Sequence, residues 1–211
     1  MNRSTTVSKY YMLLGILFCV CLVISNFFET KAVLLGPLTV TAGMLVFPVS
    51  YIINDCITEV WGYGKARQII WTGFVINFVV LLLGRIAVWL PSPDYWTGGE
   101  SFNFVFGLAP RITAASLVAF VVGSLLNSKV MSRMKARAGE RRFSIRAVVS
   151  SLIGECADSL VFFPIAFAGL MPAAELLKMM ALQAALKTLY EIVVLPLTVV
   201  VVRWLKKAEM S

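Results

Sequence analysis

Long apolar runs recur along the whole chain, and they constrain its fold more than any other feature of the sequence. A helix needs about 20 mostly apolar residues to cross the hydrocarbon core of a bilayer. Because the runs do not stop after the N-terminal segment, a cleaved signal peptide does not explain them. The sequence therefore predicts an all-α membrane protein, a six-transmembrane-helix bundle that forms one domain over residues 1–211. Charged residues, Gly or Pro bound the expected helices, which are 10–29, 36–60, 68–91, 109–129, 147–171 and 178–203.

The composition excludes several other classes of protein. The chain is 59% hydrophobic and only 14% charged, which is too few polar residues for a water-soluble domain of this size. It has no histidine, and its four cysteines lie in or beside apolar segments without a CxxC pair. We therefore expect no metal site, no cofactor and no disulfide framework. Any proton chemistry would have to use carboxylates.

The basic residues predict an orientation in the membrane. Residues 129–146 carry seven Lys and Arg but only one acid, Glu140, and further basic residues lie near both termini. Loops on the cytoplasmic side are enriched in Lys and Arg. We therefore expect the 129–146 loop and both termini to be cytoplasmic, with the chain spanning the inner membrane several times. The net charge of +8 reflects this asymmetry, so no nucleic-acid partner is expected.

Seven charged residues of the expected helices are candidates for positions inside the membrane. A charge at the bilayer centre costs roughly 2.5–3.5 kcal/mol on insertion scales, so each one needs a partner, a cavity or a function. Five of the seven are acids, and the set is Asp55, Glu59, Arg85, Glu155, Asp158, Lys187 and Glu191.

The depths of these residues distinguish them. Asp55 and Asp158 lie deepest among the acids, and there are too few cations to pair with every acid, so both are strong candidates for ligand binding. Glu59 lies near the cytoplasmic end of its helix, where water could solvate it. Lys187 and Glu191 are one helical turn apart and could form an ion pair.

Helical spacing places the acids beside aromatic side chains. Phe47, Tyr51, Asp55 and Glu59 recur every four residues, so an aromatic surface leads into a carboxylate surface on one helix face. Phe162 follows Asp158 by one turn in the same way. A flat ligand rich in hydrogen-bond donors could use both surfaces. With polar residues of the other helices added, the candidate substrate-binding residues are Asp55, Asp158, Glu59, Glu155, Glu191, Lys187, Asn26, Asn77, Arg85, Phe47, Tyr51 and Phe162.

Small residues and prolines predict local features of the bundle. Pro48 lies inside the expected second helix and predicts a kink there. Ala115, Ala119 and Gly123 form a small-residue stripe that suits close helix packing. We expect this packing to be intramolecular, and a homodimer through the stripe is the alternative.

Four stretches resemble one known family, the queuosine-precursor transporters, which are a branch of the vitamin uptake transporters. GPLTVTAGMLVFPVSYIINDCITEVWGYGKAR resembles the family signature, SNFFETK the end of its first helix, RAVVSSLIGECADSLVFFPIAFAG its fifth helix and KTLYEIVVLPL its sixth. Trp61 stands where a Tyr is more familiar. The resemblance covers nearly the full chain. It implies a fold like that of the substrate-binding subunits of energy-coupling-factor vitamin transporters.

The resemblance also implies a substrate, which is 7-cyano-7-deazaguanine, 7-aminomethyl-7-deazaguanine or queuine, taken up for queuosine modification of tRNA. A guanine-like edge offers N1–H and an exocyclic amine as adjacent donors, which Asp55 or Asp158 could accept. A further acid would suit the aminomethyl cation. The aromatic candidates could stack on the ring, and Asn26, Asn77, Arg85 or Lys187 could donate to its carbonyl. Which acid contacts the base stays open.

Several mechanisms and functions remain as alternatives. Transport could follow a substrate gradient, couple to protons or use a partner ATPase, and no GxxxxGK[ST] nucleotide-binding motif occurs in the sequence. Facilitated uptake without an ATPase is favoured. The chain could instead be a substrate-binding subunit for another vitamin-like molecule, a purely structural subunit or an intramembrane hydrolase. The missing histidine and the lack of a nucleophile with an adjacent base argue against an enzyme.

Overall fold

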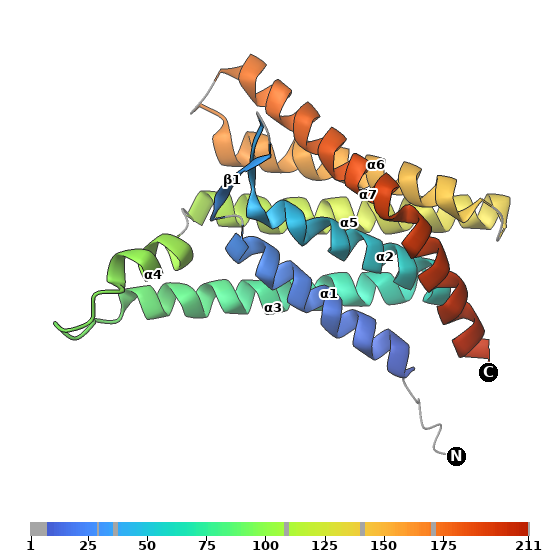
Figure 1. The fold of residues 1–211 in the computed structure, drawn as a ribbon, viewed down its shortest axis with the longest axis horizontal. Helices are drawn as coiled ribbons and strands as arrows, with labels where there is room; N and C mark the ends of the chain where they lie inside the picture. The colour runs from blue at the N-terminus through green and yellow to red at the C-terminus, as the bar shows by residue number, and fades with distance from the viewer. Residues whose placement is uncertain are drawn as a thin grey trace.

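Six long helices account for most of the chain, and Figure 1 shows how they lie against one another. A computed structural model describes residues 8–28, 30–35, 38–107, 110–139, 142–169 and 172–210. The six helices are α1 (Lys9–Phe28), α2 (Phe47–Trp61), α3 (Tyr63–Trp89), α5 (Pro110–Ala138), α6 (Phe143–Phe167) and α7 (Ala173–Met210). The described residues contain six helical spans long and apolar enough to cross a membrane. The six-helix prediction is confirmed, and the chain is a multi-pass membrane protein.

The segment before α2 differs from the prediction. Instead of continuing a helix from residue 36, it forms an antiparallel hairpin of β1 (Ala32–Leu35) and β2 (Leu38–Thr41), followed by the 3₁₀ helix η1 (Ala42–Leu45). The β-branched residues of β2 favour an extended backbone. Pro48 then falls in the first turn of α2, where its missing N–H breaks no helical hydrogen bond. The predicted kink in the middle of this helix is therefore wrong.

Helix α2 lies in the interior of the bundle. Eleven of its 15 residues are buried, and it packs against α1, α3, α5 and α7. Helices α1 and α3 instead carry many exposed large apolar side chains, as expected for helices that face lipid. The short helix α4 (Gly99–Phe106) lies between α3 and α5. This arrangement gives α2 no broad lipid-facing surface, so its polar residues point into protein.

Helices α5 and α6 approach each other closely at two glycines. A side chain at Gly123 would meet the carbonyl oxygen of Gly154 at 2.9 Å, and one at Gly154 would meet the carbonyl oxygen of Gly123 at the same distance. Ala115 and Ala119 of the small-residue stripe are buried inside the bundle. The stripe thus packs within this chain, as expected. A homodimer stays a prediction.

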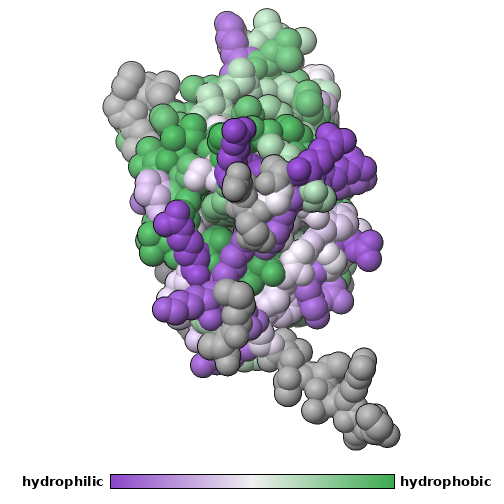
Figure 2. Space-filling model, turned by 90° about the vertical axis from the view of Figure 1, so that its right-hand side faces the viewer, coloured by the Kyte–Doolittle hydropathy of each residue, from purple (hydrophilic) through white to green (hydrophobic). Residues whose placement is uncertain are grey.

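The start of α1 and the end of α7 lie at the same end of the molecule. Ser8 hydrogen-bonds to Glu209, and the indole of Trp61 donates to the other carboxylate oxygen of Glu209 at 3.1 Å. The rings of Tyr10 and Trp204 meet edge to face at 5.0 Å. The turn between α5 and α6 lies at this end as well (Figure 1). Figure 2 views the molecule from this end, where hydrophilic side chains gather.

Candidate functional site

Polar side chains from α2, α5, α6 and α7 meet inside the bundle. A buried polar group is costly unless it is hydrogen-bonded, and a buried charge more so. Such a concentration in a membrane protein therefore marks a candidate functional site. The buried polar residues of these four helices include Asn54, Asp55, Glu59, Ser124, Asn127, Ser128, Arg146, Ser151, Glu155, Asp158 and Glu191.

Asp55 is fixed by two neighbouring helices. The side-chain amide of Asn127 on α5 donates to Asp55 Oδ1 at 2.9 Å, and the hydroxyl oxygen of Ser151 on α6 lies 3.3 Å from Asp55 Oδ2. The same hydroxyl oxygen lies 2.7 Å from Glu191 Oε1 on α7. Ser151 thus bridges two carboxyl groups that come from different helices.

Asp158 lies beside a cation and two aromatic rings. The ammonium of Lys187 forms an ion pair with Asp158 Oδ2 at 3.4 Å and lies 4.3 Å from the centre of the Phe47 ring. The rings of Phe47 and Tyr51 are tilted against each other, with their centres 5.5 Å apart. The aromatic face that the sequence predicted is therefore present, and a cation already covers part of it.

Gly123 lets Tyr51 and Asp158 approach each other. A side chain added at Gly123 would meet the Tyr51 hydroxyl at 2.7 Å and Cβ of Asp158 at 2.9 Å, so both side chains lie against this glycine. The Tyr51 hydroxyl is buried, with the hydroxyl of Ser124 within reach of it. A buried hydroxyl beside a carboxyl group is a place where a ligand can donate and accept hydrogen bonds.

Glu155 lies next to this group and is also buried. The hydroxyl of Thr188 on α7 donates to Glu155 Oε2 at 3.0 Å. Since Thr188 follows Lys187 in the sequence, Glu155 and Asp158 both face the same turn of α7. Four acids and one lysine thus form the inner cluster, which we define as Asp55, Glu155, Asp158, Lys187 and Glu191.

Glu59 belongs to a separate group of charges near the end where the termini lie. Arg146 donates to its two carboxylate oxygens at 2.7 and 3.0 Å. Lys206 on α7 donates to Glu59 Oε1 at 2.6 Å, and Lys135 on α5 lies 3.5 Å from the same oxygen. The carboxylate is fully buried, so water does not solvate it as the sequence had allowed. These contacts tie together the ends of α2, α5, α6 and α7.

The structure brings most of the predicted site residues together. Phe47, Tyr51 and the five members of the inner cluster gather around one region, and Phe162 lies one turn from Asp158 on α6. Besides Glu59, three predicted residues lie elsewhere. Asn26 donates to Asn77 at 3.0 Å, which joins α1 to α3, and the Arg85 side chain is exposed on α3.

Several residues that support the site were not predicted from the sequence. Asn127 and Ser151 hold Asp55, and Thr188 holds Glu155. A usable signal was present in α5, where Ser124, Asn127 and Ser128 have the spacing of one helix face within an apolar segment. Asn127 donates to Asp55, and Ser128 exchanges hydrogen bonds with Asn54. Two of these three residues therefore bond to α2 side chains.

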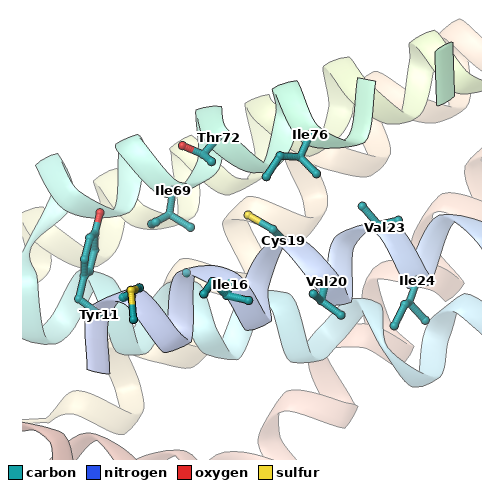
Figure 3. A pocket seen from close by; sticks show the side chains of 11 residues that line it. Tyr11, Ile16, Cys19, Val20, Val23, Ile24, Ile69, Thr72 and Ile76 are labelled. Carbon is teal, nitrogen blue, oxygen red and sulfur yellow. The ribbon is translucent and has the colours of Figure 1, made fainter. Parts of the chain in front are cut away.

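An apolar groove lies between α1 and α3, and Figure 3 shows its lining. Its volume is about 530 Å³. Tyr11 and Thr72 bring hydroxyls to its wall, but these already donate to the carbonyls of Lys65 and Gln68. The groove thus suits lipid chains better than a ligand rich in hydrogen-bond donors.

The sequence is similar to three curated bacterial proteins. It is 27% identical over 154 residues to "Probable queuosine precursor transporter" of Bacillus subtilis, which covers 72% of this chain and 66% of that protein. It is 33% identical over 127 residues to the protein of the same name from Haemophilus influenzae, covering 60% and 52%. It is 28% identical over 169 residues to "Queuosine precursor transporter" of Escherichia coli, covering 79% and 74%. The chain thus spans between half and three quarters of the length of these relatives.

No solved structure matches the chain. The model of the family described as "Putative vitamin uptake transporter" matches residues 41–201, a range that includes the inner cluster and Glu59. The match covers well over half of the chain. This protein therefore belongs to the vitamin uptake transporter family, which is a family of membrane transporters and not of enzymes.

Proposed function

We propose that this protein imports a queuosine precursor, 7-cyano-7-deazaguanine or 7-aminomethyl-7-deazaguanine, across the inner membrane for use in tRNA modification. The names of the three relatives support a substrate of this kind. The observation that carries the proposal is the buried hydroxyl of Tyr51 beside Asp158. These groups offer hydrogen bonds to a polar, flat molecule in the interior of a membrane protein.

Asp158 is the acid to which we assign the guanine-like edge. Both oxygens of Asp55 already have neighbours, Asn127 and Ser151, which hold it in place. Asp158 instead has Lys187 on one oxygen and the Tyr51 hydroxyl close by. A carboxylate can accept N1–H and the exocyclic amine together, and the aromatic rings of Phe47 and Tyr51 supply an apolar wall for the base.

The surplus of acids supports the aminomethyl compound as a second substrate. The inner cluster holds four carboxyl groups and one ammonium, and we assign Glu155 as the partner of the added cation. A charge-assisted hydrogen bond of this kind is stronger than one between neutral groups. The neutral 7-cyano compound would rely on Asp158 and the aromatic rings alone.

We further propose that the end of the bundle near Glu59 faces the cytoplasm. The basic end of α5, the start of α6 and both described chain ends lie there, as cytoplasmic segments enriched in Lys and Arg would. In this orientation the ionic contacts of Glu59 close the cytoplasmic side of the substrate site. Import then requires these contacts to open and reform in each cycle.

Uptake by cells that cannot make either precursor tests the proposal. Radiolabelled 7-cyano-7-deazaguanine and 7-aminomethyl-7-deazaguanine are given to cells with wild type, Asp158→Asn, or the control Asp94→Asn, which changes an exposed acid of the α3–α4 loop. Uptake by wild type and the control but not by Asp158→Asn is expected, at equal amounts of protein in the membrane. Equal uptake by Asp158→Asn would reject the assigned acid, and absence of wild-type uptake would reject the substrates.

Purified protein in liposomes without ATP then tests the mode of transport. Net uptake under these conditions supports a transporter that works alone. Binding without uptake would instead identify a substrate-binding subunit that needs a partner ATPase.

A further inference from the structure

Asp55, Ser151 and Glu191 form a continuous chain of two carboxyl groups and one hydroxyl where α2, α6 and α7 meet. The hydroxyl oxygen of Ser151 lies 2.7 Å from Glu191 Oε1 and 3.3 Å from Asp55 Oδ2. Asp55 and Ser151 are fully buried, and Glu191 is 3% exposed. These three groups are therefore isolated from water in this conformation.

The number of hydrogens in this chain indicates a bound proton. The serine hydroxyl supplies one hydrogen, which the short contact to Glu191 Oε1 uses, whereas the 3.3 Å contact to Asp55 Oδ2 is longer than an ordinary O–H···O hydrogen bond. The side chains of Asp55 and Glu191 also lie within hydrogen-bonding reach of each other, and because an ionised carboxylate supplies no hydrogen, this contact requires one on Asp55 or Glu191. The remaining oxygen of the glutamate, Glu191 Oε2, is also buried and receives no hydrogen bond from an amide, hydroxyl or ammonium group of the described residues. Two negative charges around one hydroxyl would repel each other strongly at this depth.

The other charged groups around the pair already have partners of their own. On α6 and α7, Lys187 forms its ion pair with Asp158, and Glu155 accepts from Thr188. On α2, Glu59 holds the cations Arg146, Lys206 and Lys135, which come from α6, α7 and α5. The titratable residues Tyr51 and Cys56 of α2 and the amide of Asn127 on α5 complete the surroundings.

We propose that Asp55 and Glu191 share one proton through Ser151, and that this proton crosses the membrane together with the substrate. The second half of this statement rests on the proposed transport function, whereas the shared proton does not. In one cycle, one proton and one substrate molecule leave the outer side, and one of each arrives in the cytoplasm. A protonated pair carries less charge while α2, α6 and α7 move past one another, which lowers the cost of passage through an apolar interior.

Infrared spectroscopy of the substrate-free protein tests the shared proton. A protonated carboxyl group has a C=O stretching band that a carboxylate lacks. We expect wild type at neutral pH to show a band that Asp55→Asn and Glu191→Gln lose. The control Glu100→Gln, which changes an exposed acid on α4, should keep it. A wild-type spectrum without such a band, or one unchanged in both variants, would overturn the shared proton.

Proton movement during transport tests the coupling. Purified protein is placed in liposomes that contain a pH-sensitive dye, and 7-cyano-7-deazaguanine is added outside without an imposed gradient. We expect the lumen to acidify in proportion to the labelled substrate that enters, and the ratio of protons to substrate to be lost in Glu191→Gln. The variant Ser151→Ala removes the bridging hydroxyl but keeps both acids. It should reduce the ratio of protons to substrate.

The outcomes of the two experiments separate the two proposals. Substrate uptake by wild type without acidification would overturn the coupling while the proposed function stands. Absence of uptake together with a protonated carboxyl band would overturn the proposed substrates and leave the shared proton in place. A ratio that is unchanged in Glu191→Gln and in Asp55→Asn would assign the coupled proton to another group and overturn the proposal.

Discussion

Arg146 holds Glu59 through both terminal nitrogens of its guanidinium, at 2.7 and 3.0 Å, and both side chains are buried. This two-fold contact joins the start of α6 to the end of α2. Lys206 and Lys135 add α7 and α5 to the same carboxylate. One acid therefore balances three cations at the end of the bundle that we propose is cytoplasmic.

Removal of this carboxylate is predicted to destabilise the protein strongly. In Glu59→Gln, the three cations lose the negative charge of this buried carboxylate. Breaking one partner of a buried ion pair typically costs about 3–5 kcal/mol. Thermal unfolding in detergent should show a clearly lower midpoint for Glu59→Gln. The control Glu100→Gln should unfold like wild type, and an equal shift in both variants would contradict the prediction.

The glycine between Tyr51 and Asp158 is predicted to tolerate no side chain. In Gly123→Ala the new methyl group would lie 2.7 Å from the Tyr51 hydroxyl and 2.9 Å from the carbonyl oxygen of Gly154, so α5 and α6 would have to separate. Overpacking of this kind costs about 1–3 kcal/mol. We expect lower stability and loss of measurable binding of 7-cyano-7-deazaguanine to purified protein.

Gly64→Ala is the matched control for this variant. Gly64 lies in the first turn of α3, and an added side chain there meets nothing within 4 Å. It should bind the base as wild type does. Normal binding by Gly123→Ala would show that the base does not occupy the space beside Tyr51.

The fold was largely predictable from the sequence because the bilayer imposes a simple rule of length and hydrophobicity. Each predicted helix contains or overlaps one observed helix. The start of α2 was not predictable in this way. Residues 38–41 are as apolar as a membrane helix requires, and hydropathy alone does not distinguish a short β-strand from a helix.

The partners of the buried charges were harder to predict than the charges themselves. Helical spacing within each segment identified Tyr51, Asp55 and Asp158. Such spacing contains no information on which helices meet. Arg146 was assigned to a cytoplasmic loop because of its basic neighbours, whereas it lies on α6 and is buried against Glu59. The same limit explains why Asn127 was missed.

Lys187 is predicted to influence which precursor is preferred. Its ammonium neutralises Asp158 and covers the Phe47 ring, so Lys187→Met leaves the inner cluster with acids only. The affinity for a cationic ligand then rises relative to the affinity for a neutral one, because the cationic ligand supplies the missing positive charge. Competition uptake should show a higher ratio of 7-aminomethyl-7-deazaguanine to 7-cyano-7-deazaguanine than in wild type.

Lys207→Met serves as the control for this experiment, since Lys207 is exposed near the end of α7. It removes the same charge outside the inner cluster and should leave the ratio unchanged. A ratio that falls in Lys187→Met would place the cation of the substrate away from the inner cluster.

The pair Asn26 and Asn77 is predicted to stabilise the α1–α3 contact without binding substrate. Their side chains bond to each other at 3.0 Å on helices other than the three that carry the inner cluster. Hydrogen bonds between membrane helices contribute about 0.6 kcal/mol on average. A double-mutant cycle with Asn26→Ala and Asn77→Ala should give a coupling energy of this order in unfolding experiments. The affinity for 7-cyano-7-deazaguanine should stay as in wild type. A large loss of affinity in either variant would show that these residues take part in substrate binding.

The orientation of the bundle predicts which reagents reach which loops. Ala136 lies exposed near the end of α5, at the basic end of the molecule, and Ser92 lies exposed after α3 at the opposite end. In a background without the four native cysteines, Ser92→Cys should react with a membrane-impermeant maleimide added to intact cells with a permeable outer layer. Ala136→Cys should react only after the inner membrane is opened, because Lys and Arg are retained on the cytoplasmic side. The reverse pattern would place Glu59 and its cations on the outer side and would assign them to closure of the entrance instead of the exit.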